Sequence, residues 1–229
     1  MQVHNLILIG TVHGDPQGYA RAKKLLAHLK PDMVTVEISP FSLRYRLKHG
    51  AVWQRQLTQA LSRLPEAAPR HLAIRRLAAQ VALPFEVKAA RDYHRAAGVP
   101  WLPLDLGSPA RRHLPRYGPE LLSLANLQAL LATADGSFEE FIAAEFNRAR
   151  LALAHSARRL PTARSPEVLR RERFLARRLR RLTFQYPRVA HLGGWEHLMA
   201  WQEGPGLWHD LEDVHPRRVL LDEADRLLA

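Results

Sequence analysis

Three Gly-x-x-His tetrads occur in the sequence, and two of them follow short apolar runs. These two are residues 10–13 and 194–197, whereas residues 206–209 lie in a Gly/Pro-rich stretch without a preceding run. A tetrad of this composition also arises by chance, so the preceding apolar run gives the motif its weight. Imidazole is an acid–base group and a metal ligand near neutral pH. We therefore take His13 and His197, but not His209, as candidate functional residues.

A carboxylate within an apolar run is a second chemical signal. Glu37 stands in the stretch VTVEI, where burial without a partner would be strongly unfavourable. It could instead lie on an exposed sheet edge or pair with Arg44 or Arg46. We expect a functional role, because the preceding strand–helix–strand pattern places it beside the turn that carries His13.

Two further carboxylates fall inside the apolar stripes of predicted helices. At about 100° per residue, Glu145 lies within the stripe of helix 137–159, and Glu172 lies within that of helix 166–183. The simplest interpretation pairs each acid with one of the many arginines. Acids that face the helical core could also line a pocket.

The elements that must position these residues alternate between short strands and longer helices. Four runs read as buried strands, at 4–9, 33–38, 99–104 and 188–192. Helices are expected at 41–63, 67–81, 86–97, 119–131, 137–159 and 166–183, with one more between the first two strands. The pattern predicts an α/β fold with a small, mainly parallel sheet of about four strands. We expect one domain over 1–229, with large helical insertions at about 41–97 and 108–183.

The first two strands and their connecting helix form a βαβ unit, which predicts that these strands are parallel neighbours. Ligands of open α/β sheets collect at the carboxyl ends of the strands. The four strands end near His13, Glu37, Asp105 and His197. The sequence therefore predicts that two imidazoles and two carboxylates share one edge of the sheet.

Composition limits the classes of protein to consider. The chain of 229 residues is 47% hydrophobic and contains no cysteine, which excludes disulfides, thiolate catalysis and Cys-ligated metals. No stretch provides the roughly 18 apolar residues of a membrane span, and the first residues do not resemble a signal peptide. We expect a cytoplasmic protein without a membrane span.

The net charge of +12 comes from 34 basic residues, of which 29 are arginine, against 22 acidic ones. A solvated, arginine-rich surface is the simplest interpretation, and nucleic-acid binding is an alternative. The densest cluster, residues 169–182, has helical periodicity but lacks the interleaved series of aromatic side chains that stacks bases. Nucleic acid is therefore possible but not favoured.

With these motifs in place, the chain resembles the TraB/PrgY/Tiki superfamily, which has ChaN-like and erythromycin-esterase-like relatives. The resemblance rests on the first Gly-x-x-His, on the segment KPDMVTVEIS, and on the tail RERFLARRLRRLTFQYPRVAHLGGWEHL. It covers both ends of the chain, and the middle matches in outline only. The corresponding positions are Gly10, His13, Glu37, Glu172, Gly194 and His197.

The resemblance implies an α/β fold, and the Tiki branch implies a metal-dependent protease that uses such histidines and glutamates. The chain departs from the family after the third strand. Many TraB members have Asp-Arg there, whereas this chain has Asp105-Leu106, with Arg111 and Arg112 further along. It also lacks the membrane segments of some members.

The combined expectation is hydrolysis of a peptide or ester bond with a divalent ion, Mn²⁺, Co²⁺ or Zn²⁺. Imidazole and carboxylate groups suit such an ion, which would activate a water molecule. The predicted ligands are His13, Glu37 and His197, and Gly10 and Gly194 belong to the cofactor-binding turns. Glu37, Glu172, Glu145 and Arg44 are the predicted catalytic residues, with Glu172 or Glu145 as a further ligand or base and the arginine as the oxyanion partner.

Three alternatives stay open. Glu37 and His13 could act as an acid–base pair directly on the substrate, without a metal. The chain could be a catalytically silent member of the fold that binds a small molecule or peptide. An arginine-rich nucleic-acid-binding protein is the third, and its affinity would depend steeply on salt. The sequence leaves the oligomeric state open.

Overall fold

One all-parallel sheet of five strands forms the base of the molecule. The computed structural model describes residues 5–154, 165–199 and 206–228. The strand order is β3-β2-β4-β1-β5. The strands are β1 (Leu6–Thr11), β2 (Met33–Val36), β3 (Trp101–Pro103), β4 (Val189–Gly194) and β5 (Arg217–Leu220). The predicted α/β class with a small parallel sheet is confirmed, with one strand more than the four expected; His4 lies outside the described residues.

Burial explains which strands the sequence revealed. β1 and β2 are buried along their whole length and β4 along all but its last residue, as near-continuous apolar runs in a sheet covered on both faces should be. β5 begins with two arginines, and only its last two residues, Val219 and Leu220, are buried. Its short, charged sequence carries no strand pattern, although it pairs in parallel with β1.

The prediction that β1 and β2 are neighbours is wrong, because β4 lies between them. Leu192 of β4 is in register with Ile9 on one side and with Val36 on the other. A right-handed βαβ crossover fixes the direction of two strands but leaves room for a later strand between them. The insertion brings the ends of β1 and β4 together, with Thr11 opposite Gly194.

Helices account for most of the remaining chain. The α-helices are α1 (Gly18–Leu29), α2 (Pro40–Leu61), α3 (Leu72–Val81), α4 (Phe85–Ala97), α5 (Gly107–His113), α6 (Leu124–Leu131), α7 (Phe138–Ala154) and α8 (Pro166–Thr183). Shorter 3₁₀ turns are η1 (Ala68–Arg70), η2 (Leu114–Arg116), η4 (Trp195–Leu198), η5 (His209–Val214) and η6 (Leu221–Leu228), and η3 (Tyr117–Leu121) is a π-helical turn. Within the described ranges, no helix is both long and apolar enough to cross a membrane.

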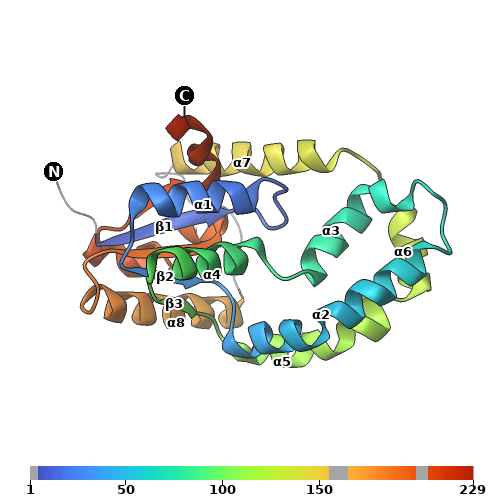
Figure 1. The fold of residues 1–229 in the computed structure, drawn as a ribbon, viewed down its shortest axis with the longest axis horizontal. Helices are drawn as coiled ribbons and strands as arrows, with labels where there is room; N and C mark the ends of the chain where they lie inside the picture. The colour runs from blue at the N-terminus through green and yellow to red at the C-terminus, as the bar shows by residue number, and fades with distance from the viewer. Residues whose placement is uncertain (1–4, 155–164, 200–205, 229) are drawn as a thin grey trace.

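The connections place a crevice between β1 and β4. α1 and α4 lie side by side on one face of the sheet (Figure 1). After β3 the chain returns towards β1, and a right-handed crossover in this direction places α8 on the opposite face, against β4. β1 connects towards β2, whereas β4 connects past β1 to β5. Their carboxyl ends therefore form the topological switch point, where open α/β sheets bind ligands.

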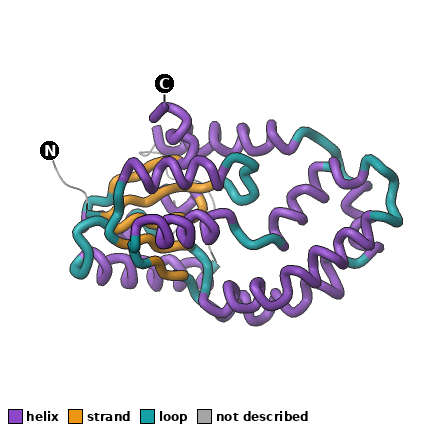
Figure 2. Tube along the Cα trace, in the orientation of Figure 1, coloured by secondary structure: helices purple, strands orange, loops and turns teal. Residues whose placement is uncertain are grey.

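A helical arm extends away from the strands (Figure 2). It has its own hydrophobic cluster, formed by Trp53, Leu57, Ile74, Leu77, Val81, Leu114, Leu122 and Leu127. The predicted insertions are therefore divided between two places. α2, α3, α5 and α6 build the arm, whereas α4, α7 and α8 contribute to the main core through residues such as Val87, Phe146 and Leu179.

Candidate functional site

A cleft of about 540 Å³ opens at the carboxyl ends of the strands. Its polar lining includes Thr11, His13, Glu37, Arg46, Glu86 and Arg171. A second hollow of about 440 Å³, towards α7 and η4, shares Thr11, His13, Glu37 and Arg171 with it. The side chains predicted to act at the strand ends therefore line one continuous hollow at the switch point.

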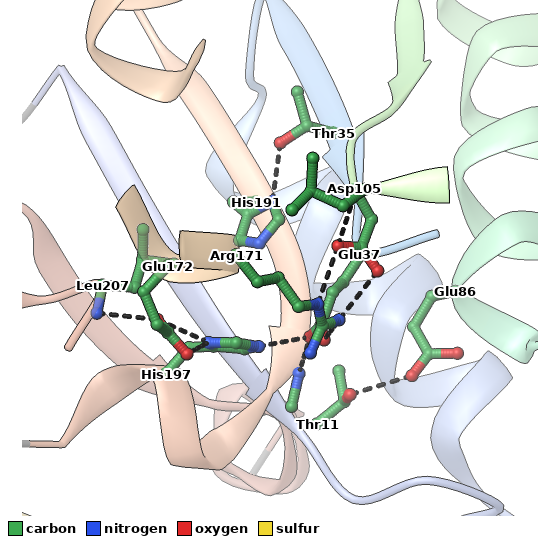
Figure 3. Close-up of polar contacts among 12 residues, drawn as sticks. Thr11, Thr35, Glu37, Glu86, Asp105, Arg171, Glu172, His191, His197 and Leu207 are labelled. Atoms are coloured by element: carbon green, nitrogen blue, oxygen red, sulfur yellow. Dashed lines mark hydrogen bonds and ion pairs between the residues drawn. The ribbon is translucent and has the colours of Figure 1, made fainter. Parts of the chain in front are cut away.

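Glu37 is the centre of a network of charges (Figure 3). One carboxylate oxygen pairs with Arg171, and the other accepts the backbone N–H of Gly194 at 2.7 Å. Arg171 also donates to Asp105 as a fork, from Nε to Oδ1 at 2.7 Å and from Nη2 to Oδ2 at 2.8 Å. Burial alone would raise the pKa of Glu37, but the charges of His197 and Arg171 hold it well below its usual range.

His197 is held between two carboxylates (Figure 3). Its Nε2 lies 2.9 Å from Oε2 of Glu37, and its Nδ1 lies 2.9 Å from Oε1 of Glu172. Glu172 is 1% exposed and also accepts the backbone N–H of Leu207 at 2.7 Å. Burial lowers the pKa of His197, but the two carboxylates outweigh it and raise this pKa to about 10. At neutral pH the ring is therefore an imidazolium ion that donates from both nitrogens.

These contacts bear on the predicted metal centre. A metal needs a free lone pair on imidazole nitrogen, but both nitrogens of His197 donate to carboxylates. The oxygens of Glu37 are engaged by Arg171, Gly194 and His197. Across the described residues, no group of three or more His, Asp or Glu is placed to hold a metal ion. The donor set in this arrangement does not fit a divalent ion.

His13 occupies a different environment at the end of β1. The turn bonds Asp15 N–H to Val12 C=O at 3.1 Å, and Gly14 adopts a left-handed φ of 82°. The surrounding protein atoms and then the charge of Arg46 lower the pKa of His13, against the opposing effect of Glu37. The imidazole is therefore neutral at physiological pH. It remains accessible from the cleft, and within the described chain no hydrogen bond or ion pair joins it to Glu37 or His197.

The inserted strand β4 explains this separation. The predicted placement of Glu37 beside the His13 turn depended on β1 and β2 being adjacent. Because β4 lies between them, Glu37 contacts Gly194 and His197 instead. The two predicted imidazoles thus lie on the same edge, but only one of them is bonded to the predicted carboxylate.

Glu86 is a buried acid of the cleft that the sequence did not single out. It lies in the first turn of α4 and is 6% exposed. Thr11 donates its hydroxyl to Oε1 of Glu86 at 2.8 Å (Figure 3), and Oε2 has no hydrogen-bond partner among the described residues. Burial, with the nearby charges of Glu37 and Asp15, raises the pKa of Glu86 to about 7. Much of the population is therefore a neutral carboxylic acid near pH 7.

His191 is a second buried polar group, in the middle of β4. It is 1% exposed, and its Nδ1 lies 2.9 Å from the hydroxyl of Thr35 (Figure 3). In the described part of the chain its Nε2 has no partner. Burial lowers the pKa of His191 to about 4, so the ring is neutral. A side chain on Gly193 would come within 2.9 Å of this nitrogen and 2.8 Å of Glu37 Oε2, so glycine is needed there.

The remaining predicted catalytic residues lie at the edge of the site or outside it. Glu145 accepts from Trp195 Nε1 at 3.3 Å and pairs with Arg148 at 3.0 Å, as in the simplest interpretation. Arg44 is exposed and lines neither hollow. The prediction of Arg44 fails because α2 turns by about 100° per residue, so that the side chain facing the cleft is Arg46.

The glycines predicted to bind a cofactor have packing roles. A side chain on Gly10 would approach the Trp195 Cα to 3.0 Å, so glycine lets η4 lie against β1. Gly194 supplies the N–H that binds Glu37. Cofactor binding at either stays a prediction. His209, which the sequence disfavoured, is half exposed and 3.5 Å from Glu212.

Four cleft residues were missed, and each had a weak signal. His191 is a polar residue within an apolar strand, which is the signal that identified Glu37. Arg171 precedes Glu172 within an arginine-rich helix, where nothing distinguishes it from its neighbours. Thr11 lies inside the first tetrad, and Glu86 is an ordinary first-turn acid of α4. Only the assembled fold selects them.

The arginine-rich segment forms α8, and its arginines divide by role. Arg171 and Arg180 form ion pairs with acids of other elements. An exposed face carries Arg170, Arg173, Arg177, Arg178 and Arg181. A solvated basic face is the simplest account, and nucleic-acid binding stays a prediction.

Comparisons with known proteins add no assignment. No family model, no curated protein and no solved structure matches the chain. The relation to the TraB/PrgY/Tiki superfamily therefore stays a prediction that rests on the residues quoted above.

Proposed function

We propose that the chain is a hydrolase that cleaves an ester or amide bond by acid–base catalysis, with His13 as the base and Glu86 as the acid. The observation that carries the proposal is the presence of both groups in one cleft at the switch point of the sheet. One is an accessible, neutral imidazole, and the other is a buried carboxylic acid that is protonated near pH 7. Groups with such pKa values suit proton transfer at physiological pH.

The proposed reaction begins at His13. Its neutral imidazole removes a proton from a water molecule, and the water oxygen forms a bond to the carbonyl carbon of the substrate. Glu86 then gives its proton to the leaving oxygen or nitrogen as the bond from that atom to the carbonyl carbon breaks. Thr11 holds Oε1 of Glu86, so Oε2 is the oxygen that carries this proton.

The network around Glu37 would act as a support for this chemistry. Arg171 lines the cleft and keeps its charge, because Glu37 and Asp105 raise its pKa further. A fixed positive charge next to the reacting carbonyl stabilises the negative charge that develops on its oxygen. Glu37 and His197 are then positioning residues. No step requires a metal, in agreement with the donor atoms already being engaged.

Hydrolysis of 4-nitrophenyl acetate and 4-nitrophenyl butyrate tests the proposal, with wild type compared with His13→Ala. Loss of a general base should lower kcat/KM by about 10²- to 10⁴-fold. His28→Ala is the matched control, because His28 is an exposed histidine of α1 outside the cleft, and it should leave the rate unchanged. Equal rates for wild type and His13→Ala would overturn the proposal.

The pH profile gives an independent readout of Glu86. The active form has neutral His13 and protonated Glu86, so kcat/KM should be bell-shaped and fall above about pH 7. In Glu86→Gln the fall above pH 7 should disappear together with most of the rate. If ligands bind in the cleft but no ester or peptide is turned over, the silent binding protein is the better description.

A further inference from the structure

The cleft contains two arginines in contrasting situations. Arg171 is neutralised by Glu37 and Asp105. Arg46 reaches the same cleft from α2, and in the part of the chain that the structure describes it forms an ion pair with no carboxylate. Its positive charge is therefore available to a bound molecule.

Neutral groups clamp Arg46 in place. Its Nη1 donates to the carbonyl oxygens of Gln80 at 2.7 Å and Ala82 at 2.9 Å, at the end of α3. Its Nε lies 3.4 Å from the hydroxyl of Ser42, and the guanidinium lies 5.8 Å from the centre of the Tyr117 ring. These contacts fix the orientation of the guanidinium without cancelling its charge. Burial lowers the pKa of Arg46, which means that the charge is held at a cost in solvation.

The start of α2 adds partial positive charge at the same wall. Ser39 caps this 22-residue helix and, with Ser42, lines the cleft. The first turn of α2 has no acidic residue, whereas α4 and α8 carry Glu86 and Glu167 in theirs. The helix dipole of α2 is therefore not compensated by a side chain of its own first turn.

We propose that this wall is an anion subsite, in which Arg46 binds a carboxylate or phosphate group of the substrate beside His13. The proposal deepens the proposed function, since it names the substrate class as an ester or amide that bears such a group. A guanidinium binds a two-oxygen anion through paired hydrogen bonds. Arg46 and His13 interact electrostatically, so the anionic end would lie next to the base. Apolar residues such as Val36, Leu106 and Val168 line the rest of the cleft.

Calorimetric titration of the full chain with sodium phosphate and with sodium succinate, at low ionic strength, tests the subsite. Arg46→Gln should weaken binding at least tenfold. Because the chain carries a net charge of +12, nonspecific anion binding must be separated from the subsite. Arg44→Gln serves this purpose, as it removes the same charge from an exposed position of the same helix and should bind like wild type. Tighter binding of phosphate or of succinate identifies the preferred group.

Equal affinities in wild type, Arg46→Gln and Arg44→Gln would overturn the subsite, as would absence of anion binding by wild type. Arg46→Lys, which keeps the charge but loses the fork, should bind with intermediate affinity and replaces Arg46→Gln if that variant does not fold. Turnover then separates the two proposals. Arg46→Gln should raise KM for 4-nitrophenyl hydrogen succinate but not for 4-nitrophenyl butyrate. Arg46-dependent anion binding without turnover of either ester would leave the subsite standing and overturn the hydrolase.

Discussion

The two Gly-x-x-His turns have the same motif, follow adjacent parallel strands and yet hold their histidines in opposite states. His13 is accessible, has a lowered pKa and belongs to no ion pair in the described chain. His197 is buried between Glu37 and Glu172, and its pKa is raised to about 10. One ring is thus able to accept a proton, whereas the other already holds one and keeps it.

The difference arises from what each strand end meets. The end of β4 meets acids from β2's exit and from α8, and two carboxylates in contact with one imidazole favour its charged form. The end of β1 meets Arg46 and the end of α3, which favour the neutral form. A motif of four residues therefore fixes where an imidazole lies, and the surrounding elements fix its chemistry.

The largest expected effect separates the two histidines by stability. His197→Ala removes the cation between Glu37 and Glu172 and leaves two buried carboxylates unpaired, which should reduce the free energy of unfolding by about 3–5 kcal/mol. His13→Ala should change it by no more than about 0.5 kcal/mol, since the ring is exposed. Urea denaturation at pH 7 measures both. A small effect of His197→Ala would mean that the buried network is not needed for folding.

The acid beside the first turn should show a smaller effect of opposite sign. The pKa of Glu86 rises from 4.5 to about 7 on folding, so the stability it contributes is complete below pH 4.5 and is lost as the pH rises through 7. Glu86→Gln removes this penalty and should stabilise the chain by up to about 3 kcal/mol at pH 8, relative to the difference at pH 4. Thermal unfolding at the two pH values measures it, with exposed Glu66→Gln as the control. A Glu86→Gln variant that is less stable at pH 8 contradicts the raised pKa.

The class of the fold was predictable because the buried strands are apolar enough to stand out from their flanks. β4 and β1 are recognisable alone, and the helix between β1 and β2 fixes their shared direction. Strand order was not predictable, because no local pattern records that β4 inserts between β1 and β2. β5 also escaped, since half of its residues are arginines at an exposed end.

The site was predictable to a similar degree. Residues that contradict their local pattern, such as Glu37 inside an apolar run and Glu172 inside an apolar stripe, do belong to the charged network. Their partners were not predictable. Arg171 was one arginine among 29, and the choice of Arg46 over Arg44 depends on a helix rotation that a range of expected helical residues does not specify.

Direct titration of the two rings sharpens the comparison further. In nuclear magnetic resonance spectra, His197 should stay protonated on both nitrogens from pH 5 to 8, and His13 should titrate below 6.5. The stability that His197 contributes is then complete below pH 6.5 and declines as the pH rises through about 10. Assignment uses the spectra of His13→Ala and His197→Gln. Both rings titrating together near 6.5 would erase the distinction between the two turns.

The smallest expected effect is that of metal ions. Zn²⁺ or Mn²⁺ would have to displace the protons of His197 and the donors around Glu37, so neither ion should bind at one equivalent, and EDTA should leave ester hydrolysis unchanged. Calorimetry with wild type and His13→Ala measures the first point, and rates with and without EDTA measure the second. A tight single site lost in both His13→Ala and His197→Ala would restore the predicted metal centre. In that case the two imidazoles would act as equivalent ligands, and the contrast between the turns would describe only the metal-free chain.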